Sequence, residues 1–296
     1  MLYFGWVGIK LRSSNMICNK QIVNAPMWAA EIINKRTNGF KPKIAIVLGS
    51  GLGKVAEQIE NPTTIPYEEL PFFNVSKLEG HGGKMYLGML NGVPAVCLAG
   101  RTHTYEGGQA MDVIKTIGRT LKLIGCEILF TTCAVGSLNK ESGPGSLVLV
   151  KDHINFMSSN TLIGENDARF GERFPSLNNT YDAELRKKIL NVAQNMEIPI
   201  TEGIHLGTSG PTFETPAEIR MFKMFGADII GMSNIPEVMV ARHCGIKVIT
   251  IGAVVNLAAG MDDEVLSHEG TLQGAKLAVE KLANLILGFV KDLKGN

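Results

Sequence analysis

Short apolar runs recur along the chain and alternate with longer segments in which apolar residues repeat at helical spacing. The apolar runs are rich in Ile, Val and Leu and have the length of buried strands. They cover Ile44–Leu48, Pro94–Leu98, Glu127–Thr131, Leu147–Val150, Ile229–Met232 and Lys247–Val255. Helical patterns cover Met111–Ile124, Tyr181–Met196, Pro216–Phe225, Ile235–Cys244 and a C-terminal segment with Val279, Leu282, Ile286, Phe289 and Leu293 on one face. This alternation predicts an α/β fold with a mixed or mainly parallel sheet.

The helix predicted at Pro216 has a well-marked start. Thr215 is a candidate N-cap, Pro216 suits the first helical position, and Glu218 completes a capping box. No internal repeat, low-complexity tract or Pro/Ser-rich linker divides the chain, so we predict one domain over residues 21–296. Residues 1–20 begin with a short apolar run followed by basic residues, and we interpret them as a disordered N-terminal extension.

Composition argues against several classes of protein and site. The 296 residues are 45% hydrophobic and 19% charged, which is enough to bury a sizeable core, and the net charge is +1. Because no block of like charge stands out, neither a nucleic-acid partner nor a membrane surface is indicated. No stretch is long and apolar enough to span a bilayer. The five cysteines are scattered and form no C-x-x-C pair, so we expect no disulfide framework, no metal site and a reducing, cytoplasmic location.

A glycine-rich stretch, IAIVLGSGLGK, begins at Ile44 and is followed by the helix-like segment VAEQIE. Strand, glycine turn and helix are the layout of a phosphate-binding loop, because free backbone N–H groups at the helix start attract anions. The stretch does not fit the dinucleotide fingerprint, since Lys54 stands at its last position, and its glycine spacing does not fit the P-loop. Ser50 adds a hydroxyl donor. From the loop alone, a tight turn that needs glycine's freedom is an equally good interpretation.

Three further polar clusters follow predicted strands, where α/β proteins build their sites. In GRTHTYEG, Arg101 offers a planar fork of donors that suits phosphate, and His103 points to the same side of an extended segment. TTCAVGS, from Thr131, offers backbone amides, and GMS, which ends at Ser233, leads into the next predicted helix. Each cluster also has a structural interpretation: a surface arginine with a satisfied histidine, a plain turn between strand and helix, and a helix cap.

Taken together, GSGLG, GRTHTYEG, GPTFET, GMSNIPEVMVARHCG and the VVN ending at Asn256 resemble the trimeric purine nucleoside phosphorylases. This family includes 6-oxopurine-specific enzymes and xanthosine-accepting relatives. The likeness runs from about Ile44 to the C-terminus. It implies a single phosphorylase domain with a mixed, twisted sheet flanked by helices, in a homotrimer with active sites near the subunit interfaces. It also implies a reaction of purine nucleoside with orthophosphate, as co-substrate, to give free purine and ribose 1-phosphate without metal or organic cofactor.

The resemblance also assigns site residues, beginning with Asn256, Glu214 and His103 as the catalytic set. Phosphate binding falls on Ser50, Arg101, His103, the backbone of Ala134, and Ser233. Base binding falls on Phe213, Glu214, Asn256 and Val135. Glu214 would accept from N1–H and from the 2-amino group of guanine, and Asn256 would bond N7 and the 6-oxo group. Without the resemblance, Glu214 reads as a solvated acid and Asn256 as a turn residue at a strand end.

The ribose is assigned to Tyr105, Met232, His268 and Phe170, and His81 aligns with a family histidine near the phosphate. Phe170 matches a residue that the family places over the sugar of a neighbouring subunit. From the residues alone, each position has a structural alternative. Met232 reads as a core residue, His81 as part of a glycine-rich loop, His268 as a helix start, and Phe170 as a loop aromatic that is buried locally.

The chain departs from the family pattern at two places. Cys133-Ala134-Val135-Gly136 stands where the family usually has Asn-Ala-Ala-Gly, and Leu257 stands where the mammalian-like branch has lysine. The segment GMDDEVLSH is more similar to the xanthosine-accepting branch, so the preferred 6-oxopurine stays open. Two alternative functions also stay open. One is a methylthioadenosine-type phosphorylase, against which Asn256 argues because those enzymes have Asp there. The other is a non-catalytic nucleotide-binding oligomer, which only Cys133 favours.

Overall fold

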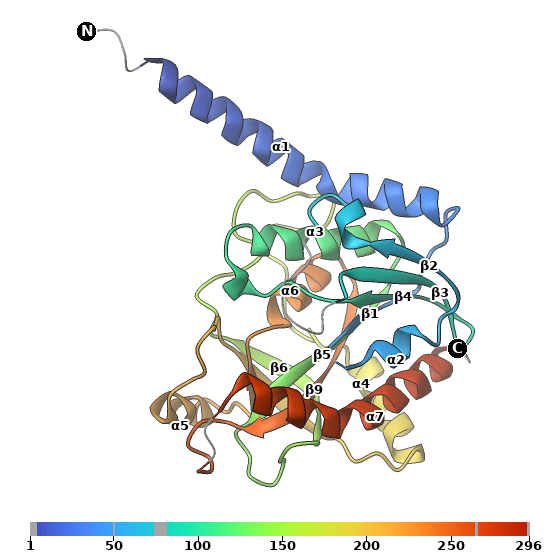
Figure 1. The fold of residues 1–296 in the computed structure, drawn as a ribbon, viewed down its shortest axis with the longest axis vertical. Coiled ribbons are helices and arrows are strands. Elements are labelled where there is room, and N and C mark those ends of the chain that lie inside the picture. The colour runs from blue at the N-terminus through green and yellow to red at the C-terminus, as the bar shows by residue number, and fades with distance from the viewer. Residues whose placement is uncertain (1–4, 50, 74–81, 264–265, 295–296) are drawn as a thin grey trace.

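A nine-stranded mixed sheet runs through the described part of the chain (Figure 1). The computed structural model describes residues 5–49, 51–73, 82–263 and 266–294. The strands are β1 (Ile44–Leu48), β2 (Glu60–Pro66), β3 (Lys84–Leu90), β4 (Val93–Ala99), β5 (Ile128–Ser137), β6 (Leu147–Asn155), β7 (Thr201–Gly207), β8 (Ile229–Gly231) and β9 (Lys247–Leu257). The helices are α1 (Gly5–Arg36), α2 (Gly53–Ala56), α3 (Ala110–Leu123), α4 (Ala183–Asn195), α5 (Pro216–Met224), α6 (Ile235–His243) and α7 (His268–Leu293), with 3-10 turns η1 (Tyr67–Glu69) and η2 (Thr104–Glu106).

Strand β5 joins an open sheet to a closed ring of strands. The open sheet runs β2-β3-β4-β1 and reaches β5 along its amino-terminal half, where Ile128–Thr131 pair with β1. The other end of β5 pairs with β8, and the order continues through β7 and β6 to β9, which pairs with β5 again. The pairs β1–β4, β1–β5, β5–β9, β6–β7 and β7–β8 are parallel, whereas β2–β3, β3–β4, β5–β8 and β6–β9 are antiparallel. The predicted mixed sheet is therefore confirmed.

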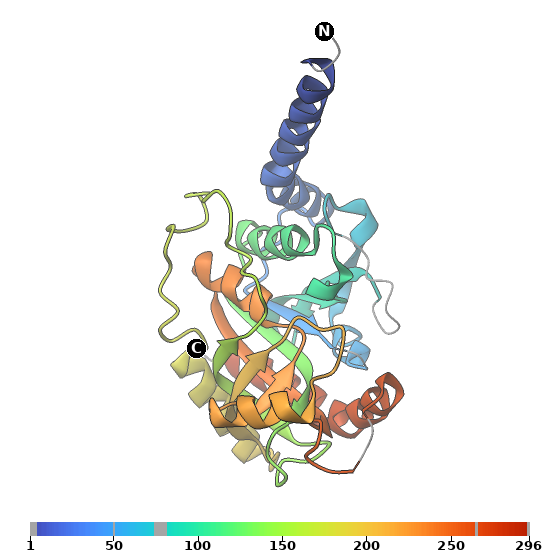
Figure 2. The same ribbon diagram turned by 90° about the vertical axis from the view of Figure 1, so that its left-hand side faces the viewer.

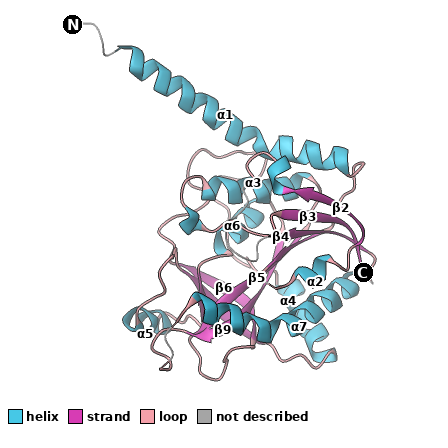
Figure 3. Ribbon diagram, in the orientation of Figure 1, coloured by secondary structure: helices cyan, strands magenta, loops and turns pink. Residues whose placement is uncertain are grey.

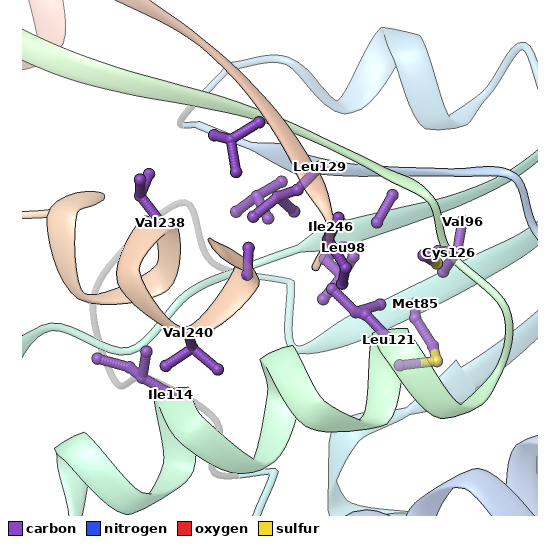
Figure 4. Close-up of a cluster of buried hydrophobic side chains, with 14 of the residues drawn as sticks. Met85, Val96, Leu98, Ile114, Leu121, Cys126, Leu129, Val238, Val240 and Ile246 are labelled. Carbon is purple, nitrogen blue, oxygen red and sulfur yellow. The ribbon is translucent and has the colours of Figure 1, made fainter. Parts of the chain in front are cut away.

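Helices cover both faces of the sheet (Figures 2 and 3). In β1, Ala45 and Val47 face a core cluster shared with α1, α3 and α6, part of which is drawn in Figure 4. Ile44, Ile46 and Leu48 face a second cluster shared with α2, α4 and α7. Successive side chains of a strand point to opposite faces, so a strand covered on both sides must be apolar throughout. This explains the continuous apolar run from which β1 is predicted.

Two helices approach their neighbours so closely that glycine is required at the contact. A Cβ at Gly118 in α3 would lie 2.6 Å from Cγ1 of Val240 in α6. A Cβ at Gly274 in α7 would collide with the carbonyl oxygen of Val255 in β9. The second contact presses the first turns of α7 against the carboxyl-terminal part of β9. As a result, α7 can form one wall of the cavity described below.

Several elements differ from the sequence prediction. The segment after the glycine loop forms a single helical turn, α2, and then enters β2 at Glu60 instead of continuing as a helix. Strands β2, β3 and β7 and helix α1 are not predicted.

The capping box at α5 is confirmed, since Thr215 Oγ1 accepts from the Glu218 N–H at 3.2 Å and Glu218 Oε2 accepts from the Thr215 N–H at 2.7 Å. Ser233 is not the cap of α6, because that position is Asn234.

Among the described residues, none of the helices combines the length and apolar character needed to cross a membrane. The domain boundary that the sequence predicts after residue 20 falls within α1. The disorder of residues 1–20 stays a prediction. From residue 21 onward the remainder of α1 packs on α3, and the Thr120 hydroxyl donates to the Pro26 carbonyl at 3.5 Å.

Candidate active site

A cavity of about 290 Å³ opens where β4 and β5 end and the first turns of α7 lie against β9. Most of the residues selected from the sequence line it, although they come from distant parts of the chain. They are Arg101, His103, Tyr105, Ala134, Val135, Phe213, Glu214, Met232, Ser233, Asn256 and His268. Ser50 and His81 lie outside the described residues. Phe170 does not line the cavity of its own chain.

Arg101 follows β4, and its side chain is held by contacts on three sides. Its Nη2 donates to the Thr132 carbonyl at 2.6 Å, and its Nη1 donates to Ser233 Oγ at 3.1 Å. Its Nε lies 3.6 Å from Oε1 of Glu237, a residue of α6. The guanidinium is therefore fixed between β5 and the start of α6, and it brings the Ser233 hydroxyl beside it. A buried cation next to a hydroxyl and backbone amides suits an anion.

Glu237 lies behind Arg101 rather than in the cavity. Burial raises the pKa of Glu237, and the guanidinium of Arg101 opposes that rise. Both residues line a second cavity of about 20 Å³, which has room for one water molecule. Glu237 Oε2 has no hydrogen-bond partner among the described residues. Arg101 is therefore the main partner that compensates the charge of this buried carboxylate, with a smaller contribution from the Asn234 backbone N–H. The sequence gives no sign of this pairing, because the two residues belong to different elements.

The entry to the glycine loop is fixed by Thr132, which sequence reasoning does not single out. The Gly49 N–H donates to Thr132 Oγ1 at 2.8 Å, and the same hydroxyl donates to the Val47 carbonyl at 3.1 Å. β1 runs parallel to the first half of β5, with Val47 opposite Thr131, so the chain leaves β1 beside Thr132 in the middle of β5. The structure therefore brings the loop and the TTCAVGS segment together, as the phosphate-binding interpretation requires.

His103 and Tyr105 form another wall of the cavity, at η2. Their rings are stacked, with centroids 4.9 Å apart and planes inclined by 15°. The Nδ1 of His103 lies 3.4 Å from Oε1 of Glu106, and the same carboxylate oxygen accepts from the His103 backbone N–H at 2.7 Å. Glu106 thus fixes the backbone of His103, and the stacking on Tyr105 orients its ring before any ligand is bound.

Two further polar residues line the cavity: Glu214 presents a carboxylate and Asn256 presents an amide. Glu214 Oε1 accepts from the Thr208 hydroxyl at 2.7 Å. Asn256 lies within β9, 9% exposed, and its Nδ2 donates to Thr271 Oγ1 at 3.4 Å. A bulge in the β5–β9 pairing at Gly136 leaves room for the Asn256 side chain, since a Cβ at Gly136 would lie 3.0 Å from Asn256 Oδ1. Asn256 is therefore a strand residue that faces the cavity, not a turn residue.

Of the two departures from the family pattern, Cys133-Ala134-Val135-Gly136 falls on the wall of this cavity, whereas Leu257 does not line it. Cys133 is 3% exposed and its thiol lies 4.0 Å from the Ile251 carbonyl. Burial raises the pKa of Cys133 to about 12, so its thiol is neutral and packs as a small apolar group. Val135 is 1% exposed and belongs to the same core cluster. Among the described residues, no group of three His, Cys, Asp or Glu side chains is placed to hold a metal ion.

Phe170 is a loop aromatic that is buried within its own chain, as the structural alternative expects. It is 5% exposed, and its ring centroid lies 4.7 Å from the guanidinium carbon of Arg119 in α3. An aromatic ring under a cation and within the core cluster is already well accommodated in its own chain. Its assignment to the ribose of a neighbouring subunit stays a prediction.

His205 is a fully buried histidine close to the back of the cavity, and sequence reasoning does not select it. It lies in β7 beside His153 of β6, and its Nε2 would be 3.2 Å from a Cβ at Gly231. Neither ring nitrogen has a hydrogen-bond partner among the described residues. Burial lowers the pKa of His205 to about 3, with smaller contributions from His153 and Arg101. The imidazole is therefore neutral throughout the physiological range.

We expect His205 to make the protein less stable in mild acid. Below pH 6.5 the unfolded chain binds a proton at this histidine and the folded chain does not, so folding stability falls as pH falls toward 3. The slope is about 1.4 kcal/mol per pH unit, or about 2 kcal/mol between pH 6.5 and 5. The variant His205→Gln removes this contribution. Urea unfolding at pH 7 and pH 5 should therefore show a smaller loss for the variant, by about 2 kcal/mol; equal losses would contradict the assignment.

Comparison with known proteins decides the family. Residues 43–291 match the family profile described as "Phosphorylase superfamily". Purine nucleoside phosphorylase 1 of Bacillus subtilis (strain 168) is 44% identical over 253 residues, which are 86% of this chain and 90% of that protein. Purine nucleoside phosphorylase of Rattus norvegicus is 39% identical over 265 residues, 87% of this chain and 91% of that protein.

The chain belongs to the purine nucleoside phosphorylase family. The crystal structure of Schistosoma mansoni purine nucleoside phosphorylase in complex with inosine superposes with a TM-score of 0.85 at 36% identity, covering 91% of this chain and 96% of that one. The predicted family and the predicted fold, a single α/β domain with a mixed sheet flanked by helices, are both confirmed. The phosphorylase family also explains why clusters from distant parts of the sequence converge on one cavity.

Proposed function

We propose that the protein is a purine nucleoside phosphorylase that cleaves inosine and guanosine with orthophosphate, giving the free purine and ribose 1-phosphate. Membership of the family makes it a pentosyltransferase. One observation carries the proposal: a single cavity is lined both by a donor-rich pair, Arg101 and Ser233, and by a carboxylate and an amide, Glu214 and Asn256. The first pair suits a phosphate dianion, and the second pair suits the N1, N7 and 6-oxo edge of a 6-oxopurine.

In the proposed reaction, a phosphate oxygen forms a bond to C1′ of the ribose while the bond from C1′ to N9 breaks. The electron pair of that bond passes to the purine, and the ribose becomes oxocarbenium-like in the transition state. Asn256 stabilises the departing base at N7 and the 6-oxo group, where negative charge develops. Arg101, Ser233 and the Ala134 N–H hold the phosphate against the sugar, so that its charge stabilises the cation. Ser50 and His81 complete this set as predictions.

The sugar lies between the phosphate and the base in this proposal. Tyr105 and Met232 lie on the same side of the cavity as His103, and His268 at the start of α7 is assigned to the 5′-hydroxyl. Phe213, which is 40% exposed, is free to cover one face of the base, while Val135 lies deeper in the wall. The donors at the phosphate end suit an anion, so orthophosphate is assigned as co-substrate and neither a metal nor an organic cofactor is assigned.

Assembly as a homotrimer and a cytoplasmic location are carried forward as part of the proposal. The trimer rests on the family resemblance. A reducing compartment is supported by the cysteines Cys97, Cys126, Cys133 and Cys244, which are buried and free of disulfide bonds. Size-exclusion chromatography with light scattering tests the trimer, since a monomer at micromolar concentration would contradict it.

The proposed function is tested by purine release from inosine, guanosine, xanthosine and adenosine, each with and without phosphate. Phosphate-dependent release from the 6-oxopurine nucleosides is the expected result. Release without phosphate would mean hydrolysis and would overturn the phosphate site. Including methylthioadenosine separates the methylthioadenosine-type alternative, because preferred cleavage of that nucleoside would overturn the role given to Asn256. No release from any nucleoside would favour the non-catalytic alternative.

A further inference from the structure

Thr208 touches the carboxylate that faces the base but lies outside the cavity. It directly follows β7, and its backbone N–H donates to the Gly231 carbonyl at 3.0 Å, which continues the β7–β8 pairing. Its hydroxyl donates to Glu214 Oε1 at 2.7 Å. Glu214 itself belongs to the segment between β7 and α5, which has no strand of its own to hold it. The hydroxyl of Thr208 therefore ties this carboxylate to the edge of the sheet.

The bond determines which part of Glu214 is available to a ligand. A glutamate side chain has three rotatable bonds, so an anchored oxygen fixes the direction in which the other oxygen points. Each carboxylate oxygen has two acceptor positions. Thr208 occupies one position on Oε1, which leaves Oε2 and the second position on Oε1 for a ligand. A hydroxyl bound to a charged acceptor is also among the stronger hydrogen bonds in proteins.

Purines differ in how many donors they bring to this carboxylate. Hypoxanthine offers only N1–H, whereas guanine offers N1–H and a 2-amino group. With hypoxanthine bound through Oε2, Oε1 has Thr208 as its donor. With guanine bound, Oε1 receives the 2-amino group and Thr208 together. The threonine hydroxyl thus satisfies the oxygen that a base without a 2-amino group would leave without a donor, and a desolvated acceptor without a donor is costly.

We propose that Thr208 is a positioning residue that sets base specificity, because its hydroxyl replaces the purine 2-amino group as the second donor to Glu214. The site then accepts purines with and without that group. This inference rests on the proposed function, in which Glu214 binds the N1 edge of the base. A purely structural role, in which Thr208 only anchors the segment after β7, would affect all nucleosides equally.

The test compares Thr208→Val, which keeps the shape and loses the hydroxyl, with Thr208→Ser, which keeps the hydroxyl. Both variants keep the backbone bond to Gly231. We expect Thr208→Val to lower kcat/KM by about tenfold for inosine and by only about twofold for guanosine, mainly through KM. Thr208→Ser should return the ratio of kcat/KM for the two nucleosides to within about twofold of the wild-type ratio.

The matched control is Thr271→Val, because Thr271 contacts Asn256 and the N7 and 6-oxo groups are common to both bases. It should lower both values alike.

Binding of hypoxanthine and guanine, measured by calorimetry on the same variants, gives the comparison without turnover. An unchanged inosine-to-guanosine ratio in an active Thr208→Val enzyme would overturn the inference, as would a Thr208→Ser variant that behaves like Thr208→Val. If the wild type shows no phosphate-dependent cleavage but Thr208→Val still weakens hypoxanthine binding more than guanine binding, the proposed function fails and the inference stands. Equal weakening of both bases would overturn the inference.

Discussion

Replacing Arg101 by alanine should lower kcat/KM for orthophosphate by about 10³-fold, because the variant loses the charged group that orients the dianion. The guanidinium donates to the Thr132 carbonyl and to Ser233 Oγ, so its removal also frees the serine hydroxyl from its neighbour. Arg101→Lys keeps the charge but lacks the planar fork whose two Nη atoms reach Thr132 and Ser233 in fixed directions, and we expect a loss of about 10²-fold. The measurement is the dependence of inosine cleavage on phosphate concentration.

The same substitution has a second effect that must be separated from catalysis. Arg101→Ala leaves Glu237 buried without its cation, which should destabilise the fold by roughly 3 kcal/mol. The double variant with Glu237→Gln removes that charge and should recover most of the stability without recovering activity. Arg220→Ala, on the exposed side of α5, is the control for loss of an arginine. Phosphate-dependent turnover of the stabilised double variant near the wild-type rate would contradict the assignment of Arg101.

Replacing Asn256 by aspartate should lower kcat/KM for inosine by about 10²-fold and raise that for adenosine. The carboxylate has no donor for the 6-oxo group and repels it, whereas a 6-amino group would supply the donor itself. Thr271 adds to the loss with inosine, because its hydroxyl hydrogen is directed to the Ser267 carbonyl at 2.9 Å and only its oxygen faces Asn256. The change in preference between inosine and adenosine is measured from the release of hypoxanthine and of adenine at saturating phosphate.

Asn139→Asp is the matched control for this substitution. Asn139 is exposed after β5, and its Oδ1 accepts from the Glu141 N–H at 3.0 Å, a bond that aspartate can also make. The control should therefore leave both nucleosides unchanged. An Asn256→Asp enzyme with an undiminished rate on inosine would show that the amide does not contact the 6-oxo group.

The strands that the sequence predicts are those buried on both faces. β1 reads as a continuous apolar run because each of its faces meets a core cluster. β2 has a single buried residue, Ile65, β3 begins with an exposed lysine and contains Gly88, and β7 contains Gly203 and His205. These strands depend on their partners for pairing rather than on their own composition, so propensity does not find them. The closure of the ring by β9 is likewise a property of pairing between distant segments.

The candidate site also contains residues that the sequence indicates and residues that it does not. Residues that would touch the ligands, such as Arg101 and Glu214, stand in motifs that carry the family resemblance. Thr132 and Glu237 also stand in stretches that the sequence singles out, whereas Thr208 does not. The contacts of all three have no local signature, because they are set by how β4, β5, β7 and α6 are placed against one another. A single sequence gives the residue type at each position but not which side chain supports which.

The closed ring of strands also bears on how the enzyme is made. During synthesis, Arg101 and the open sheet emerge early, but β9 must appear before the ring can close on β5 and β6. Asn256 arrives with that strand, and His268 follows with the helix that packs on it. A nascent chain that ends before β9 therefore contains the phosphate corner without a place for the base. Without β9 and α7 the active site does not form at all, rather than forming in a reduced version. The catalytic centre is therefore among the last features of the molecule to be completed.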